Sequence, residues 1–184
     1  MEFCQNINLS KNILSYKRSV FEIIFFSILC FTISFFLVHP QWAVGTVVNA
    51  ILFRVAITQK GLKFLLPIVI LPSLGAILSG LIFGTPVLNL FIFAPLIWLG
   101  NFLYILINKS FILKNRLNPV ISLASASIVK GGILFMGALI AVYVFNFPNI
   151  LLTAMGLIQV LTAVFGGLLA ISYQEIENMF FKQV

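Results

Sequence analysis

Apolar residues form six long runs along the chain, and short polar segments separate each run from the next. The runs cover residues 21–38, 42–57, 64–83, 86–107, 120–145 and 150–173. A helix needs about 20 mostly apolar residues to cross a bilayer, so the runs have the character of membrane spans. The pattern predicts an all-α membrane protein, a single domain over residues 1–184 that forms a bundle of six transmembrane helices.

Two parts of the sequence differ from this regular pattern of spans. A polar arm of residues 1–19 precedes the first span, and its scattered apolar residues would allow part of it to lie along the membrane as a short helix. The second span is short for a crossing, so we expect local bilayer thinning or compensation by its flanking residues.

Basic residues mark every second segment between the predicted spans. They occur in the arm, in the segment with Lys60 and Lys63, in the segment with Lys114 and Arg116, and in the tail, whereas the three alternate segments carry no Lys or Arg. Cytoplasmic loops are enriched in Lys and Arg, so the alternation predicts that both termini are cytoplasmic. Arg54 is close to the cytoplasmic end of the second span, where we expect a structural role.

Composition supports the membrane assignment and narrows the classes of function. Of the 184 residues, 61% are hydrophobic and 8% are charged, and the mean hydropathy is +1.16. The net charge of +7 does not indicate a nucleic-acid partner, because the basic residues are spread over the loops. The two cysteines, Cys4 and Cys30, lie in the arm and inside a span, so we expect no disulfide, no metal site and no cofactor.

Polar or amphipathic side chains also occur in the middle of four of the spans. They are Asn49, Trp98, Asn101, Lys130 and Gln159. In the fourth span the Trp and the Asn are three positions apart and therefore share a helical face. In the other three spans the polar residue has small residues on its own face, which is where membrane helices pack together. We therefore predict that the five residues converge on one interior substrate-binding site.

Lys130 is the most informative of these residues. A charged Lys near the bilayer midplane costs about 2.5–3.5 kcal/mol on insertion scales. The acidic residues are all near the chain ends, so none of them lies deep enough in a span to pair with it. The functional interpretation is that Lys130 meets an anionic or carbonyl-bearing ligand. The alternative is a Lys that is neutral, bonded to protein carbonyls or extended to the surface, with the buried amides serving only as contacts between helices.

Several kinds of catalytic machinery are missing from the sequence. There is no G-x-x-x-x-G-K-[ST] phosphate loop, so the chain has no nucleotide site of that kind. The single His is His39, in a loop, which leaves no Ser-His dyad and no zinc-protease motif. We predict that the protein is not an enzyme.

Two segments carry a resemblance to a known family. They are residues 39–49, HPQWAVGTVVN, and residues 95–101, PLIWLGN. These two segments, together with the six spans, the cytoplasmic termini and the lack of a nucleotide motif, resemble the S component of energy-coupling factor (ECF) transporters. The S component is the substrate-binding membrane subunit of these transporters. The resemblance implies a prokaryotic plasma-membrane protein that binds a vitamin-like or other small solute from outside. It also implies a membrane coupling subunit and ATPase subunits as partners, which drive release of the solute inward.

The same resemblance directs attention to the first span. In that family the first helix often carries an Ala-x-x-x-Ala contact for the coupling subunit, and Cys30 and Ser34 form the corresponding small pair here. Two other classes of function stay open. A non-transporting membrane subunit would use the polar residues as assembly contacts, and an integral membrane enzyme would need a catalytic set that the sequence does not supply.

Overall fold

The computed structural model describes residues 2–37, 40–58, 65–83 and 88–181, and every regular element in these ranges is a helix. Six helical segments in this part of the chain are long and apolar enough to cross a membrane. The prediction of an all-α, six-helix membrane bundle is therefore confirmed, and the protein is a multi-pass membrane protein. His39, Lys60 and Lys63 lie outside the described residues.

The helices follow the six apolar runs of the sequence. They are α1 (Glu2–Phe36), α2 (Gln41–Thr58), α3 (Leu65–Phe83), α4 (Leu88–Lys109), α5 (Pro119–Phe145), α6 (Ile150–Leu152) and α7 (Ile158–Phe181). A π-helical turn, η1 (Ser110–Lys114), extends α4, and a second one, η2 (Thr153–Leu157), joins α6 to α7 in the last crossing. The polar arm is not a separate element, because α1 runs through it without a break.

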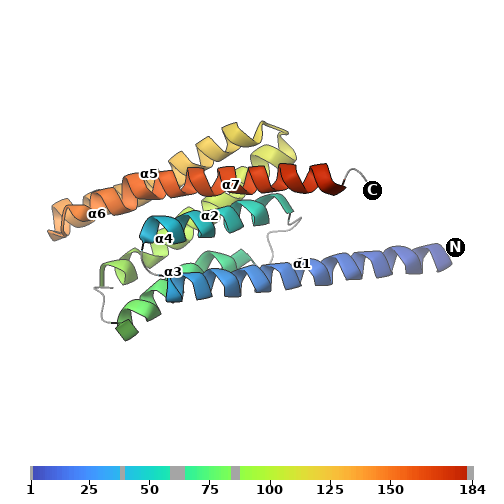
Figure 1. Ribbon diagram of the computed structural model, residues 1–184, viewed down its shortest axis with the longest axis horizontal. Coiled ribbons are helices and arrows are strands. Elements are labelled where there is room, and N and C mark those ends of the chain that lie inside the picture. The colour runs from blue at the N-terminus through green and yellow to red at the C-terminus, as the bar shows by residue number, and fades with distance from the viewer. Residues whose placement is uncertain (1, 38–39, 59–64, 84–87, 182–184) are drawn as a thin grey trace.

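The long helices run roughly parallel to one another, and the start of α1 and the end of α7 lie at the same end of the bundle (Figure 1). An even number of crossings requires this arrangement. Helix α2 packs mainly against α7 and α4, while α5 packs against α4 and α7. These four helices form a closed core, with α3 packed on α4 and α1 packed mainly on α3.

Small residues allow the helices to approach closely. A Cβ atom added at Gly75 of α3 would lie 2.5 Å from the backbone oxygen of Phe31 in α1. At Gly166 of α7 it would overlap the backbone oxygen of Thr46 in α2. Because a glycine has no side chain, the backbones of α1 and α3, and those of α2 and α7, can approach each other closely at these points.

The small pair in α1 faces the bundle and not its surroundings. Cys30 and Ser34 are 0% and 3% exposed, and α1 packs mainly on α3. The exposed side of α1 carries large apolar residues such as Ile24 and Ile28. The small pair that corresponds to the family's docking contact is therefore not accessible in this structure, because both residues are buried.

Candidate ligand-binding centre

Lys130 is the centre of a polar cluster inside the four-helix core. Its side chain is 2% exposed, so it does not extend to either surface of the bundle. The Nζ atom donates to Asn49 Oδ1 at 2.5 Å and to Asn101 Oδ1 at 2.7 Å. Three helices, α5, α2 and α4, thus meet at the Nζ atom of Lys130, which donates to two neutral amides.

Each of the two amides is also anchored by its nitrogen atom. Asn49 Nδ2 donates to Thr162 Oγ1 of α7 at 3.3 Å, and Asn101 Nδ2 donates to the backbone oxygen of Val69 in α3 at 3.2 Å. These bonds orient both amide oxygens toward Lys130, because the nitrogen of each amide is already used. The cluster therefore links five helices through side-chain hydrogen bonds.

An aromatic ring completes the surroundings of the ammonium group. The ring of Tyr104, one turn beyond Asn101 in α4, has its centroid 5.4 Å from Lys130 Nζ. This distance allows a cation–π interaction, which is stronger when the cation is shielded from water. The Tyr104 hydroxyl donates to the backbone oxygen of Ala163 in α7 at 3.0 Å, which fixes the ring in place.

Trp98, although predicted for the site, bonds elsewhere. Its Nε1 atom donates to Ser73 Oγ of α3 at 2.6 Å, and Ser73 Oγ in turn donates to the backbone oxygen of Ile70 at 2.8 Å. Trp98 and Asn101 do share a face of α4, as their spacing predicts, but that face meets α3. The indole is thus part of the α3–α4 contact, one turn from the Lys130 cluster.

Gln159 is half-buried near the start of α7, and its side chain makes no hydrogen bond to any described residue. Its backbone oxygen accepts a bond from Thr162 Oγ1 at 3.2 Å, so it supports the hydroxyl that holds Asn49. The structure therefore brings together Asn49, Asn101 and Lys130 directly, and relates Gln159 to them only through its backbone.

The sequence interpretation missed a second polar contact on the same helices. Asn108 in α4 is fully buried, accepts a bond from Ser122 Oγ of α5 at 3.0 Å and donates to the backbone oxygen of Tyr104 at 2.9 Å. The spacing of seven residues between Asn101 and Asn108 is the signal that would have found it, since positions seven apart share a helical face. This contact ties α4 to α5 on the side of the cluster nearer to η1.

Arg54 and Glu177 form an ion pair near the end of the bundle that carries the termini. Arg54 Nη1 lies 2.7 Å from Glu177 Oε2 and Nη2 lies 3.3 Å from Oε1, so the pair is bidentate. The guanidinium also lies over the ring of Tyr173, 4.9 Å from its centroid. Arg54 thus connects α2 to α7, and it takes no part in the Lys130 cluster.

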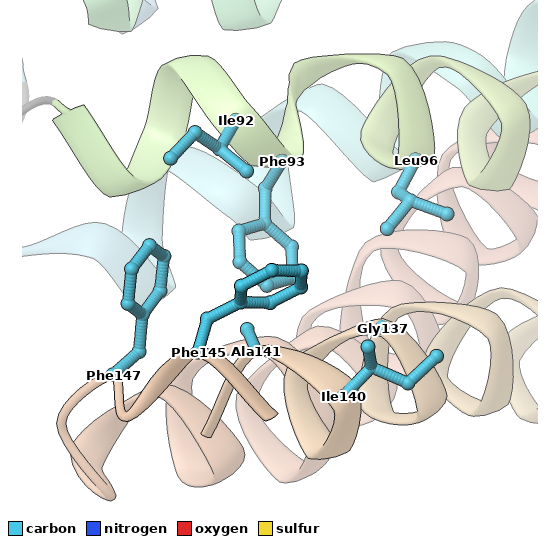
Figure 2. A pocket seen from close by; sticks show the side chains of 8 residues that line it. All are labelled: Ile92, Phe93, Leu96, Gly137, Ile140, Ala141, Phe145 and Phe147. Carbon is cyan, nitrogen blue, oxygen red and sulfur yellow. The ribbon is translucent and has the colours of Figure 1, made fainter. Parts of the chain in front are cut away.

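A pocket of about 330 Å³ lies between α4 and α5, toward the end of the bundle opposite to the termini. Figure 2 shows side chains from both helices that point into it. Its lining consists of Ile92, Phe93, Leu96, Gly137, Ile140, Ala141, Phe145 and Phe147, all of them apolar. None of the five residues predicted for the site lines this pocket.

Two glycines mark close helix contacts, one at the pocket and one beside Lys130. A Cβ atom at Gly137 would lie 2.5 Å from Leu96 Cδ1, and one at Gly100 would lie 3.3 Å from Lys130 Cγ and 3.8 Å from Leu134 Cδ1. Leu96, which lines the pocket, thus packs on Gly137, whereas Gly100 lies beside the Lys130 side chain and Leu134. Lys130 itself does not line the pocket.

The fold and the centre together define a class of protein, a six-helix integral membrane protein with a buried lysine held by amides of neighbouring helices. In the described part of the chain, no group of three or more His, Cys, Asp or Glu residues is placed to hold a metal ion. Comparisons with protein families, with curated proteins and with solved structures find no match to this chain.

Proposed function

We propose that the protein is the substrate-binding membrane subunit of an ECF-type importer in a prokaryotic plasma membrane, and that it binds a vitamin-like or other small solute. Asn49, Asn101 and Lys130 would bind the solute, with Trp98 and Gln159 supporting the walls around them. A membrane coupling subunit and ATPase subunits would supply the energy for uptake.

The position of Lys130 is the observation that supports this proposal most. The residue lies in mid-span, and among the described residues its ammonium group bonds to neutral amide oxygens. Ionisable groups inside membrane spans commonly mark sites of transport or ligand binding. A carboxylate or phosphate of a solute would supply the opposite charge that the two amides do not.

Native mass spectrometry of the protein purified in mild detergent tests the proposal. The expected result is a retained small molecule that is lost or reduced in Lys130→Met, while a variant of an exposed lysine, Lys114→Met, retains it. An isolated partner complex that contains ATPase subunits would support the transport assignment independently. Equal retention by wild-type protein and Lys130→Met would remove Lys130 from the binding site.

A second candidate is a non-transporting membrane subunit in which the polar cluster only holds helices together. The observation that favours it is that Lys130 already has two hydrogen-bond acceptors and the Tyr104 ring within the chain. Here Asn101→Leu would impair folding or assembly without changing the binding of any solute. Under the transport proposal, the fraction of Asn101→Leu that folds correctly would also bind solute weakly.

A further inference from the structure

We infer that the pocket between α4 and α5 is a binding site for the hydrocarbon tail of a molecule dissolved in the membrane. This inference concerns a different place from the Lys130 centre, and it does not rest on the proposed transport function. It stands on the chemistry of the pocket wall, on the surface onto which the pocket opens and on its shape.

The wall of the pocket offers only carbon-rich side chains. Ile92, Phe93 and Leu96 project from α4, and the rings of Phe145 and Phe147 stand on the opposite side (Figure 2). A polar group placed there would lose its hydrogen bonds to water without replacement, which is unfavourable. Apolar cavities of this kind stay dry and take up apolar molecules. The wall therefore selects hydrocarbon over any polar part of a solute.

The rim of the pocket lies on the lipid-facing surface of the bundle. Ile92 and Phe145 are 50% and 65% exposed, although both belong to helices that are long and apolar enough to cross a membrane. The neighbouring residues Phe91 and Val144 are exposed as well. A molecule that enters across this rim comes from the hydrocarbon of the bilayer, so the pocket is accessible to lipid-like molecules.

The pocket extends along the helices. Its lining on α5 runs from Phe145 to Gly137, about 12 Å at 1.5 Å per residue. Gly137 and Leu96, the lining residues farthest from the loop on their two helices, are in close contact there. A pocket of this length fits a segment of a hydrocarbon chain that lies along the helices.

The loop at the other end suits an uncharged polar head group. Residues 146–149 follow α5 directly and carry exposed side chains of Asn146 and Asn149, with no charged residue between them. Phe147 of the same loop lines the pocket and packs on the apolar cluster that includes Leu151 and Met155. The loop thus places amides beside the mouth of an apolar pocket, which is the arrangement that an amphiphile requires.

Photolabelling tests this inference with the full chain reconstituted in phosphatidylcholine vesicles. The probes are a hexadecanol and a palmitic acid that each carry a diazirine on the chain, and labelled positions are mapped by mass spectrometry. We expect saturable labelling of the α4 and α5 pocket residues by both probes, which excess unlabelled hexadecanol removes. Labelling of Ile24 and Ile28 on the exposed side of α1 should rise without saturation, because it reports ordinary contact with lipid.

Two matched variants locate the site. Ala141→Leu fills the pocket and should reduce saturable labelling at least tenfold, whereas Ala124→Leu, at an exposed position of the same helix, should leave it unchanged. If Ala141→Leu does not fold, Ile92→Trp at the exposed rim should give the same reduction.

Three results would overturn the inference. They are labelling of the pocket that does not saturate, labelling that persists in the folded filled variants, and saturable labelling by the charged palmitic acid alone, which would mean that the head group and not the tail is recognised. Each would leave the proposal for Lys130 standing, because Lys130 does not line this pocket.

Discussion

The Nζ atom of Lys130 lies 2.5 Å from Oδ1 of Asn49, although the two residues are 81 positions apart in the sequence. Their helices have other main neighbours, since α2 packs chiefly on α7 and α5 on α4. The long lysine side chain therefore connects two helices of the core whose backbones are not in close contact. This bond can therefore form only when the helices of the core are packed together.

Replacing Lys130 with Met should destabilise the protein by roughly 1–3 kcal/mol. The substitution leaves two buried amide oxygens without their donor, and each unsatisfied buried group carries a cost of about that size. Removal of a buried cation offsets part of the loss. Unfolding of the variant in detergent measures the difference, and Lys114→Met, at an exposed position, should change stability by less than about 0.5 kcal/mol.

The triple variant Asn49→Leu, Asn101→Leu, Lys130→Met separates the two contributions. When a buried donor and its acceptors are all replaced by apolar residues, the free energy of unfolding often changes little. The triple variant should therefore be more stable than Lys130→Met alone. A triple variant that is less stable than the single one would show that the amides stabilise the bundle without the lysine, through Thr162 and Val69.

Asn101 and Gln159 should respond differently to the same substitution. Asn101→Leu removes one acceptor from Lys130 and one donor from Val69, so we expect a loss of about 1–3 kcal/mol. Gln159→Leu removes a side chain with no hydrogen bond among the described residues and should stay within about 0.5 kcal/mol. Similar losses in both variants would contradict the hydrogen-bond pattern of the structure.

Two glycines provide a matched pair for the packing of the helices. An added Cβ at Gly75 meets the backbone oxygen of Phe31 at 2.5 Å, whereas at Gly132 nothing lies within 4 Å. Gly75→Ala should therefore force α1 and α3 apart at a cost of roughly 1–3 kcal/mol. Gly132→Ala should be neutral or stabilising by up to about 1 kcal/mol, because Ala favours the helix. Thermal unfolding of both variants makes the comparison.

The ion pair between Arg54 and Glu177 should contribute little to stability. Their side chains are 24% and 34% exposed, so solvent and salt screen the interaction. Arg54→Lys loses the bidentate geometry and the contact with the Tyr173 ring, and we expect a loss of about 0.5–1 kcal/mol that becomes smaller in 1 M salt. A loss of several kcal/mol, unaffected by salt, would mean that the pair is buried in the membrane-embedded protein.

The orientation of the bundle is testable with single cysteines in a background without Cys4 and Cys30. A cysteine at Asn146 should react with an impermeant thiol reagent added to intact cells, and a cysteine at Lys114 should react only after the cells are opened. Both positions are exposed, so burial does not explain a difference. The reverse pattern would place both termini outside and would contradict the distribution of basic residues.

The sequence predicts well how deep a residue lies in the membrane-spanning bundle, because this depth follows directly from counting residues along an apolar run. Asn49, Asn101 and Lys130 were expected at one level of the bundle, and their side chains do meet. Counting does not give the rotation of each helix about its own axis. That rotation is set by packing, here at glycines such as Gly75 and Gly166.

The residues whose contacts differ from expectation depend on this rotation. Trp98 donates a hydrogen bond to Ser73 of α3, and Cys30 is buried inside the bundle. The acceptors of Lys130 were equally hidden in the sequence, since nothing in it distinguishes an amide that holds a lysine from one that holds a neighbouring helix. The apolar pocket left no sequence signal, because its lining residues resemble any other part of a span.

The order of helix contacts also has a consequence for biosynthesis. Helix α2 is made second, yet its main neighbour is α7, and Asn49 bonds to Thr162, which follows it by 113 residues. At about 5–20 residues per second, a ribosome takes about 6–23 s to cover that distance. Lys130, the other partner of Asn49, follows it by 81 residues and is made earlier than Thr162. The hydrogen bonds of Asn49 therefore form in two stages during synthesis, and the contact that joins α2 to α7 can form only after the last helix has been made.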